Sequence, residues 1–211
     1  WVYAVDQSQP VTITLLDDWV APNGKFEYSK GTDSGRLHIS GGDDITIDLN
    51  GNDINRNLST ATSNGQVFRL ASGAKLTITD NSDSGDGKIT GGYNSGDGGA
   101  FYIDYGKLYI SGGEISGNKA SKGAGIYGTN EDDTYVYING GKVTGNTASG
   151  NGGGIYMNNG YLYVEGGEIT GNKAQNGAGV YWASDNKGYF TGGKIYSNSA
   201  RDNGAGLYVA N

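Results

Sequence analysis

The chain has 211 residues, a length that suits one domain, and 35% of them are hydrophobic. It contains no cysteine, which excludes disulfide bridges and thiolate metal sites. The net charge of −7, with only 15 Lys and Arg residues, argues against nucleic-acid binding, and the 40 glycines lack the three-residue period of collagen.

The N-terminal quarter carries irregular strand patterns. Apolar runs at residues 11–16 and 37–39 and an alternating run at residues 45–49 predict strands, and Asn50-Gly51 signals a turn. We therefore expect residues 1–44 to hold an N-terminal cap and an irregular first coil. Residues 45–211 are expected to form regular β-helix coils in one continuous domain. Because the single methionine, Met157, is internal, we interpret the chain as a fragment of a longer protein.

A repeat of about 26 residues fills the rest of the chain. It reads GGEISGN at residues 112–118, GGKVTGN at 140–146, GGEITGN at 166–172 and, more loosely, GGKIYSN at 192–198. Each period also carries three short apolar/polar alternations, such as Leu108-Tyr109-Ile110, which indicate strands. Three strands and three glycine-rich turns per period predict an all-β parallel β-helix, a solenoid of roughly six to seven coils.

Stacked coils turn equivalent positions into columns whose members lie roughly 4.8 Å apart. One column alternates in sign: Lys88, Glu114, Lys142, Glu168 and Lys194. Each charge then lies between opposite charges, which contributes ~0.2–1 kcal/mol per pair and opposes a slip of one coil. We interpret this column as a structural ladder.

Two further columns are expected at one corner of the coil. The first is an asparagine ladder whose amides bond along the column, formed by Asn118, Asn146, Asn172 and Asn198. The second fills a tight interior place with Ala120, Ala148, Ala174 and Ala200.

Tyrosine is unusually frequent, with 16 residues. Strand alternation places one outward column at Tyr109, Tyr137, Tyr163 and Tyr189. It places a second at Tyr102, Tyr127, Tyr156, Tyr181 and Tyr208. Both are candidate ligand-binding stripes, because a tyrosine offers a large ring and a hydroxyl that can stack on sugars or contact a protein. The alternative is that stacked tyrosines only cover the sheets and satisfy β-propensity.

Catalytic and metal sites have weaker signals. Glu114 and Glu168 lie two coils apart, near the upper end of the range for an inverting carboxylate pair, but Lys142 between them would keep both ionised. The loop DNSDSGDG offers Asp80, Asp83 and Asp86 as calcium candidates, although it lacks the spacing and closing Glu of an EF-hand. We assign no catalytic residue and no cofactor, with calcium at this loop as the one metal to consider.

The copies of Gly-Gly-x-Ile-x-x-Asn resemble the right-handed parallel β-helix repeats of bacterial secreted and cell-surface proteins, which share a pectin-lyase-like fold. Residues 46–51, Thr-Ile-Asp-Leu-Asn-Gly, are similar to a coil near the start of such domains. The resemblance covers roughly residues 11–211 and implies right-handed winding and an extracellular setting, either secreted or anchored to a bacterial surface. Because this fold serves lyases, hydrolases, epimerases and adhesins alike, it does not select a function.

Three functions are compatible with the sequence. The leading hypothesis is a non-catalytic adhesin or stalk domain that binds a glycan, mucin or surface protein through its Tyr-lined sheets. The second is a carbohydrate-active enzyme, a polysaccharide lyase or hydrolase or an inactive relative. The third is a spacer without a ligand. We expect no nucleic-acid partner, no membrane insertion and a monomer, with end-to-end association through open strand edges as the alternative.

Overall fold

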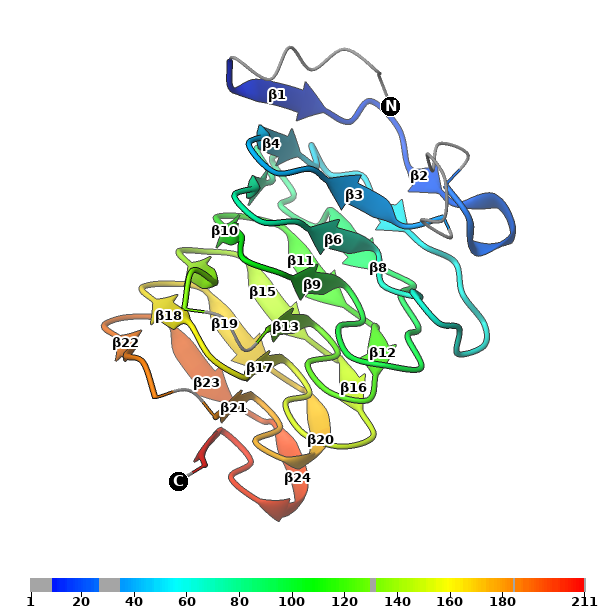
Figure 1. Cartoon of the computed structure of the whole chain (residues 1–211). Helices are drawn as coiled ribbons and strands as arrows, with labels where there is room; N and C mark the ends of the chain where they lie inside the picture. Colours follow the sequence, from blue (N-terminus) through cyan, green and yellow to red (C-terminus); the bar gives the residue numbers. More distant parts are fainter. Residues whose placement is uncertain (1–8, 27–34, 130–131, 184, 211) are drawn as a thin grey trace.

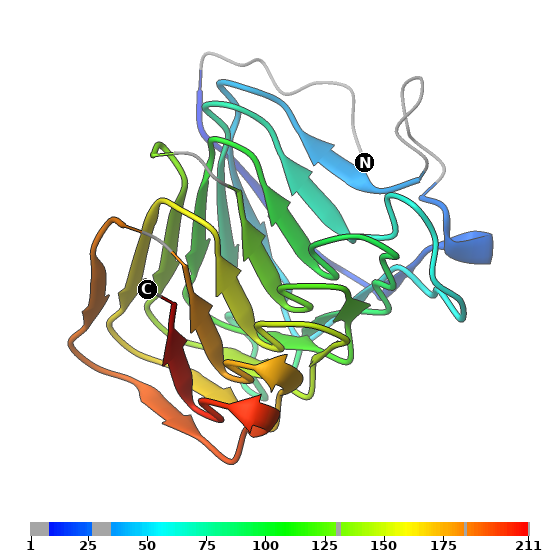
Figure 2. The ribbon, with the colours of Figure 1, turned by 60° about the horizontal axis from the view of Figure 1, so that its bottom comes forward.

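The computed structural model describes residues 9–26, 35–129, 132–183 and 185–210. These residues form one all-β, right-handed parallel solenoid of about six turns, with one short 3₁₀ helix, η1 (Pro22–Gly24). Figure 1 shows the coils stacked from the N-terminal to the C-terminal end, and Figure 2 shows them wound around a common interior. The predicted fold class is confirmed.

Each coil passes through sheet A, sheet B and sheet C, and the last four coils also pass through a small corner sheet between sheets B and C. Sheet A contains β1 (Val11–Thr14), β4 (Asp44–Asp48), β7 (Lys75–Thr79), β10 (Lys107–Ile110), β14 (Tyr135–Ile138), β18 (Tyr161–Val164) and β22 (Gly188–Phe190). Sheet B contains β2 (Trp19–Val20), β5 (Ile54–Asn55), β8 (Lys88–Thr90), β11 (Glu114–Ser116), β15 (Lys142–Thr144), β19 (Glu168–Thr170) and β23 (Lys194–Tyr196).

The other two sheets complete the coil. The corner sheet contains β12 (Lys119–Ala120), β16 (Thr147–Ala148), β20 (Lys173–Asn176) and β24 (Ser199–Asn203). Sheet C contains β3 (Leu37–Ile39), β6 (Phe68–Leu70), β9 (Phe101–Ile103), β13 (Ile126–Gly128), β17 (Ile155–Met157), β21 (Val180–Trp182) and β25 (Leu207–Val209). The sequence predicted the strands of sheets A and C and the repeat strands of sheet B, but not β2 or the short strands of the corner sheet.

The first coil belongs to the same three sheets as the later ones. β1 pairs with β4, β2 with β5 and β3 with β6, all in parallel. Its loops are longer: Trp19 of the first coil pairs with Ile54, 35 residues further on, whereas Glu114 pairs with Lys142, 28 residues further on. Residues 1–8 and 27–34, which belong to the expected cap and first coil, lie outside the described residues.

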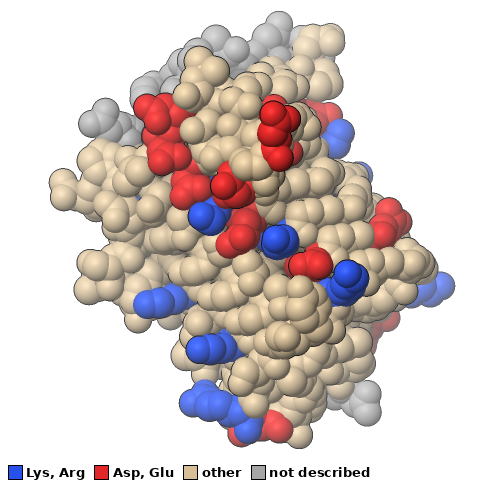
Figure 3. Space-filling view, turned by 180° about the vertical axis from the view of Figure 1, so that it is seen from behind, with Lys and Arg blue, Asp and Glu red and all other residues tan. Residues whose placement is uncertain are grey.

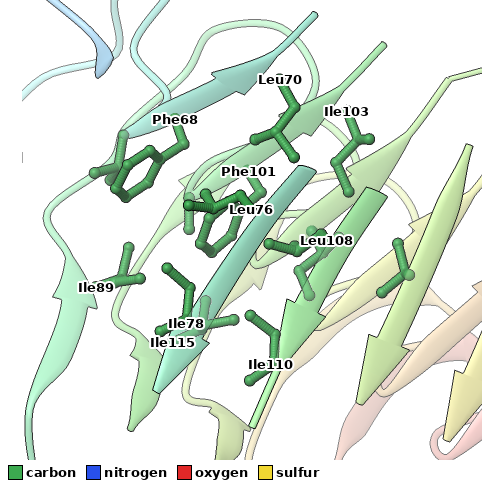
Figure 4. Close-up of a cluster of buried hydrophobic side chains, with 14 of the residues drawn as sticks. Phe68, Leu70, Leu76, Ile78, Ile89, Phe101, Ile103, Leu108, Ile110 and Ile115 are labelled. Atoms are coloured by element: carbon green, nitrogen blue, oxygen red, sulfur yellow. The ribbon is translucent and has the colours of Figure 1, made fainter. Parts of the chain in front are cut away.

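The interior is filled by columns of apolar side chains that repeat from coil to coil. Phe68 and Phe101 stack with ring centroids 5.2 Å apart and an angle of 8° between their planes. Figure 4 shows this pair beside the leucines and isoleucines that sheets A and B contribute. Inward positions such as Leu108 and Ile126 are fully buried. Burial of these columns is the main apolar contribution to stability, at roughly 25 cal/mol per Å².

The paired glycines of the repeat turn the chain from sheet A into sheet B. Gly141 has φ of +67°, a left-handed conformation that glycine adopts without strain. A Cβ atom on Gly141 would lie 2.6 Å from the carbonyl oxygen of Gly113 in the preceding coil, and one on Gly140 would lie 2.6 Å from that of Ser111. Both positions therefore require glycine because the coils stack closely at this corner.

The predicted asparagine ladder is confirmed, and it is buried. The Oδ1 of Asn146 accepts hydrogen bonds from the backbone N–H and the Nδ2 of Asn118, each at 3.1 Å. The Nδ2 of Asn146 donates to the carbonyl oxygen of Ile115 and to Asn172 Oδ1. Asn172 bonds to Asn198 in the same way. The ladder thus satisfies backbone groups that the turn leaves without partners inside their own coil.

The alanine column is also confirmed. Ala120, Ala148 and Ala174 belong to the corner strands and are buried in one cluster with Ala124 and Ala178, against which Ala200 packs partly buried. Their small side chains allow the corner sheet to lie close to the rest of the coil.

The sign-alternating column lies on sheet B in the predicted register. Lys142 pairs with Glu114 on one side and with Glu168 on the other, and Glu168 pairs with Lys194. Figure 3 shows basic and acidic side chains alternating along a row on this face. Lys194 Nζ and Glu168 Oε1 are 3.9 Å apart and solvent-accessible, so the column stabilises the fold weakly. Its larger effect is on the strand register, because a slip of one coil would place like charges next to each other.

We predict that Asn146→Ala lowers the free energy of unfolding by about 3–5 kcal/mol, because several buried polar groups each lose a partner at about 1–3 kcal/mol. Urea unfolding followed by circular dichroism measures this change. Asn198→Ala is the control, since Asn198 is only half buried in the last coil and should cost less than Asn146→Ala. Equal losses for the two variants would contradict a stabilising role for the buried ladder.

We predict that Lys142→Glu, which places three glutamates in a row, lowers the free energy of unfolding by roughly 0.5–2 kcal/mol at low ionic strength. High salt should remove most of the loss because the column faces solvent. Thermal unfolding at two salt concentrations checks this, with Lys142→Gln as the control that removes the charge without reversing it. A loss that salt leaves unchanged would show that packing, and not charge, is responsible.

Candidate functional site

The outer face of sheet A carries two columns of tyrosines in register. The first runs through Tyr109, Tyr137, Tyr163 and Tyr189, and Thr46 and Thr77 occupy its first coils. The second column contains Tyr135 and Tyr161, preceded by Lys75 and Lys107. All six tyrosines are partly exposed, and Tyr189 reaches 38% exposure. We call this surface the tyrosine face.

The rings of the tyrosine face stack on one another along the solenoid axis. Ring centroids are 4.4 Å apart for Tyr109 and Tyr137, 4.6 Å for Tyr137 and Tyr163, and 4.8 Å for Tyr163 and Tyr189, with planes within 8° of parallel. Tyr135 and Tyr161 stack at 5.0 Å. The flat faces of the inner rings are thus covered by their neighbours. What the stacks present to solvent is ring edges and hydroxyl groups.

Two lysines flank the stacks at their N-terminal ends. Lys75 Nζ lies 5.7 Å from the ring centroid of Tyr109, and Lys107 Nζ lies 5.3 Å from that of Tyr135. Lys75 also pairs with Asp44 at 3.0 Å. Each lysine therefore covers a ring face where its stack begins, through a cation–π contact.

Burial raises the pKa of three tyrosines of this face. Burial, together with the neighbouring hydroxyls of Tyr109 and Tyr163, raises the pKa of Tyr137 to about 12. Burial is also the first cause that raises the pKa values of Tyr135 and Tyr163. At neutral pH the face is therefore a row of uncharged O–H groups, each able to donate and to accept a hydrogen bond.

The second predicted stripe, on sheet C, differs from the first. Tyr102, Tyr127, Tyr156, Tyr181 and Tyr208 are in register, as expected. However, Tyr127 is only 7% exposed and Tyr156 only 6%. The glycine turns before each strand pack against these side chains: a Cβ on Gly152 would lie 2.7 Å from Tyr156 Cβ. The middle of this stripe therefore offers little surface to a ligand, a difference that strand alternation alone did not reveal.

A polar hollow of about 360 Å³ opens at the N-terminal end of the sheet C stripe. Its lining includes Arg36, Gln66, Asn94, Asp97 and Tyr102. Behind it, burial and then the charge of Arg36 lower the pKa of the buried Arg56 to about 10. Sequence reasoning missed this hollow, because most of its lining lies in irregular loops, where no column marks the residues.

The calcium-candidate loop is held by its own hydrogen bonds. Asp80 Oδ1 accepts from the backbone N–H of Gly51 at 2.9 Å and from the Ser82 hydroxyl at 2.7 Å, while Oδ2 accepts from the N–H of Gly87 at 2.8 Å. Asp86 accepts a short hydrogen bond from Ser84. Within the described residues, no group of three or more His, Asp or Glu side chains, Asp80, Asp83 and Asp86 included, is arranged to hold a metal ion.

The carboxylate pair considered for catalysis has the expected arrangement. Lys142 lies between Glu114 and Glu168 in the strand register. Glu168 also accepts a hydrogen bond from the Tyr196 hydroxyl at 2.9 Å. An inverting mechanism needs one carboxyl of such a pair to act as a general acid, and here a lysine stands between the two carboxyl groups in the strand register.

No family model matches the chain, and neither a curated protein nor a solved structure matches it. The described part of the chain also contains no helix with the length and apolar character needed to cross a membrane.

We predict that the free energy of unfolding falls between pH 10 and pH 12, because the pKa of Tyr137 rises from 10.0 to about 12 on folding. Between these values the unfolded chain has lost a proton that the folded chain keeps, so the contribution is complete below pH 10 and is lost as the pH rises through 12. Urea unfolding at a series of alkaline pH values checks the trend.

Tyrosinate absorbance provides a direct control for this assignment. The native protein should contain tyrosines that ionise later than those of the urea-unfolded chain, and Tyr137→Phe should reduce that late-titrating fraction. Identical titration curves for the native and unfolded chains would contradict the raised pKa values.

Proposed function

We propose that the chain is a non-catalytic binding segment of an extracellular bacterial protein, an adhesin or stalk domain that binds a glycan along its tyrosine face. The observation that carries this proposal is the set of six stacked, partly exposed tyrosines on sheet A. A contiguous exposed aromatic surface of this kind is typical of interaction sites. The extracellular bacterial setting comes from the sequence resemblance.

The stacked geometry specifies how a ligand would be held. Because the inner ring faces are covered, a sugar cannot lie flat on them as the sequence suggested. Instead, the hydroxyls form a row with a spacing close to the ring separations of 4.4–4.8 Å. A ring edge is the positive part of the aromatic quadrupole, so it attracts oxygen atoms. The face therefore suits a linear polymer rich in hydroxyl groups that runs along the solenoid axis.

The rigidity of the tyrosine face supports a ligand-binding role for these residues over a role limited to covering the sheet. The inner tyrosines, Tyr137 and Tyr163, are held between stacked neighbours, so little of their side-chain entropy remains to be lost when a ligand binds. The column moreover changes from Thr46 and Thr77 to tyrosine at residue 109 without leaving the sheet. Threonine therefore suits these positions structurally, which weakens the view that the strands need tyrosine for β-propensity alone.

Two variants of the four tyrosines at 109, 137, 163 and 189 test the proposal on a glycan and polysaccharide array. Replacement of all four by Phe keeps the stack but removes the hydroxyls. It should weaken binding at least about ten-fold, since each hydrogen bond contributes about 0.5–1.5 kcal/mol. Replacement of all four by Thr extends the natural threonine column and should abolish binding.

The control is Tyr181→Phe with Tyr208→Phe on sheet C, which should leave array binding unchanged. Circular dichroism and thermal unfolding confirm that each variant is folded. Binding that survives in both sheet A variants would overturn the assignment of the tyrosine face. Absence of binding by the unaltered chain would favour the spacer function.

A further inference from the structure

The outer surface of the corner sheet contains a column of unbalanced positive charge. Its outward residues are in register as Lys119, Thr147, Lys173 and Ser199. In sheet B the positions between lysines carry glutamate, whereas here they carry hydroxyl residues. The two lysines therefore lie two coils apart, roughly 10 Å by the strand spacing, with no carboxylate between them in the column.

A hollow of about 340 Å³ lies over this column. Lys173 and Arg201 bring positive charge to its lining, and Thr147, Ser149 and Ser199 bring hydroxyl groups. The remaining lining residues are Ala148 and Ala174, so the hollow contains no acidic side chain. Figure 3 shows basic side chains gathered along one edge of this face, apart from the alternating row.

A hydrogen bond positions Arg201 at the edge of the hollow. Arg201 extends along the solenoid axis, and its NH2 group donates to the carbonyl oxygen of Ser149, two coils away, at 2.8 Å. The acidic residue that follows it, Asp202, accepts a hydrogen bond from Gln175 at 2.8 Å. At the other end of the column, Lys119 Nζ lies 5.1 Å from the ring centroid of Tyr93. The arginine is thus fixed before any ligand arrives.

We propose that this hollow and the lysine column along it, together called the groove, bind the sulfate groups of a linear sulfated polysaccharide that runs along the corner sheet. The lining supplies five groups that can donate hydrogen bonds, two of them cationic. A sulfate ester presents three terminal oxygens to such donors, one more than a carboxylate, and remains ionised at all physiological pH values. The lysine spacing selects a chain whose anionic groups recur about every 10 Å. This site is separate from the tyrosine face and does not depend on it.

The test compares dextran sulfate, carboxymethyl dextran and unmodified dextran of matched length, with binding measured by isothermal titration calorimetry. The groove variant combines Lys119→Gln, Lys173→Gln and Arg201→Gln. The control combines Lys88→Gln, Lys142→Gln and Lys194→Gln on sheet B, which changes the net charge by the same amount. We expect the groove variant to lose about 100-fold in affinity for dextran sulfate, while the control changes less than about three-fold.

Salt provides an independent measurement. The affinity of the unaltered chain for dextran sulfate should fall as ionic strength rises, and the groove variant should show a shallower dependence because fewer ion contacts are lost. Equal losses in the groove and control variants would overturn the proposal in favour of non-specific charge. Equal affinity for carboxymethyl dextran would overturn the preference for sulfate.

Glycan binding by the tyrosine face and sulfate binding by the groove can be tested independently of each other. The variant with threonine at positions 109, 137, 163 and 189 should bind dextran sulfate as tightly as the unaltered chain. If the threonine variant no longer binds dextran sulfate while the groove variant binds it with unchanged affinity, the sulfated chain lies on sheet A and the groove proposal is wrong. Thermal unfolding of all variants shows that any loss of binding comes from folded protein.

Discussion

Residues one coil apart lie side by side at the spacing of hydrogen-bonded strands, roughly 4.8 Å. A side chain in a strand of the regular coils therefore lies beside the equivalent side chain of the next coil. A residue type is stable in a column only if it can contact its own kind or a complementary kind. This one constraint explains the buried asparagines, the stacked rings and the alternating charges, although these columns share no chemistry.

The columns resolve the constraint in different ways. An asparagine amide contains both a donor and an acceptor, so Asn118, Asn146 and Asn172 can bond to one another while fully buried. Tyrosine rings stack with planes nearly parallel, which buries apolar area on both faces. Charged side chains cannot stack with their own sign, so sheet B alternates lysine and glutamate. The corner sheet instead separates Lys119 and Lys173 by a neutral threonine, which leaves their charge available to a ligand.

Most of this organisation could be predicted from the sequence, because a fixed period converts spacing directly into register. The pairing of Glu114 with Lys142 and the Asn146 ladder were predicted and are present. Burial of Tyr127 and Tyr156 was not, because it depends on how closely the glycine turns approach sheet C. The hollow near Arg36 was also missed, because most of its lining lies in irregular loops, which give no column to follow. The corner strands were overlooked because β12 and β16 have only two residues each, and because alanine is the one apolar residue in each of the four strands, which leaves no apolar/polar alternation to detect.

The same constraint separates structural columns from surfaces able to bind. A column whose groups are satisfied by neighbouring coils has no remaining capacity for a ligand, and the buried asparagines and sheet B charges meet that description. The tyrosine face differs, since stacking satisfies the rings but leaves their hydroxyl groups directed to solvent. The corner sheet differs as well, since its lysines have no carboxylate above or below them in the column. Hydroxyl groups and positive charges that repeat along the solenoid axis suit a ligand whose own polar groups repeat at regular intervals. A linear polysaccharide is such a ligand.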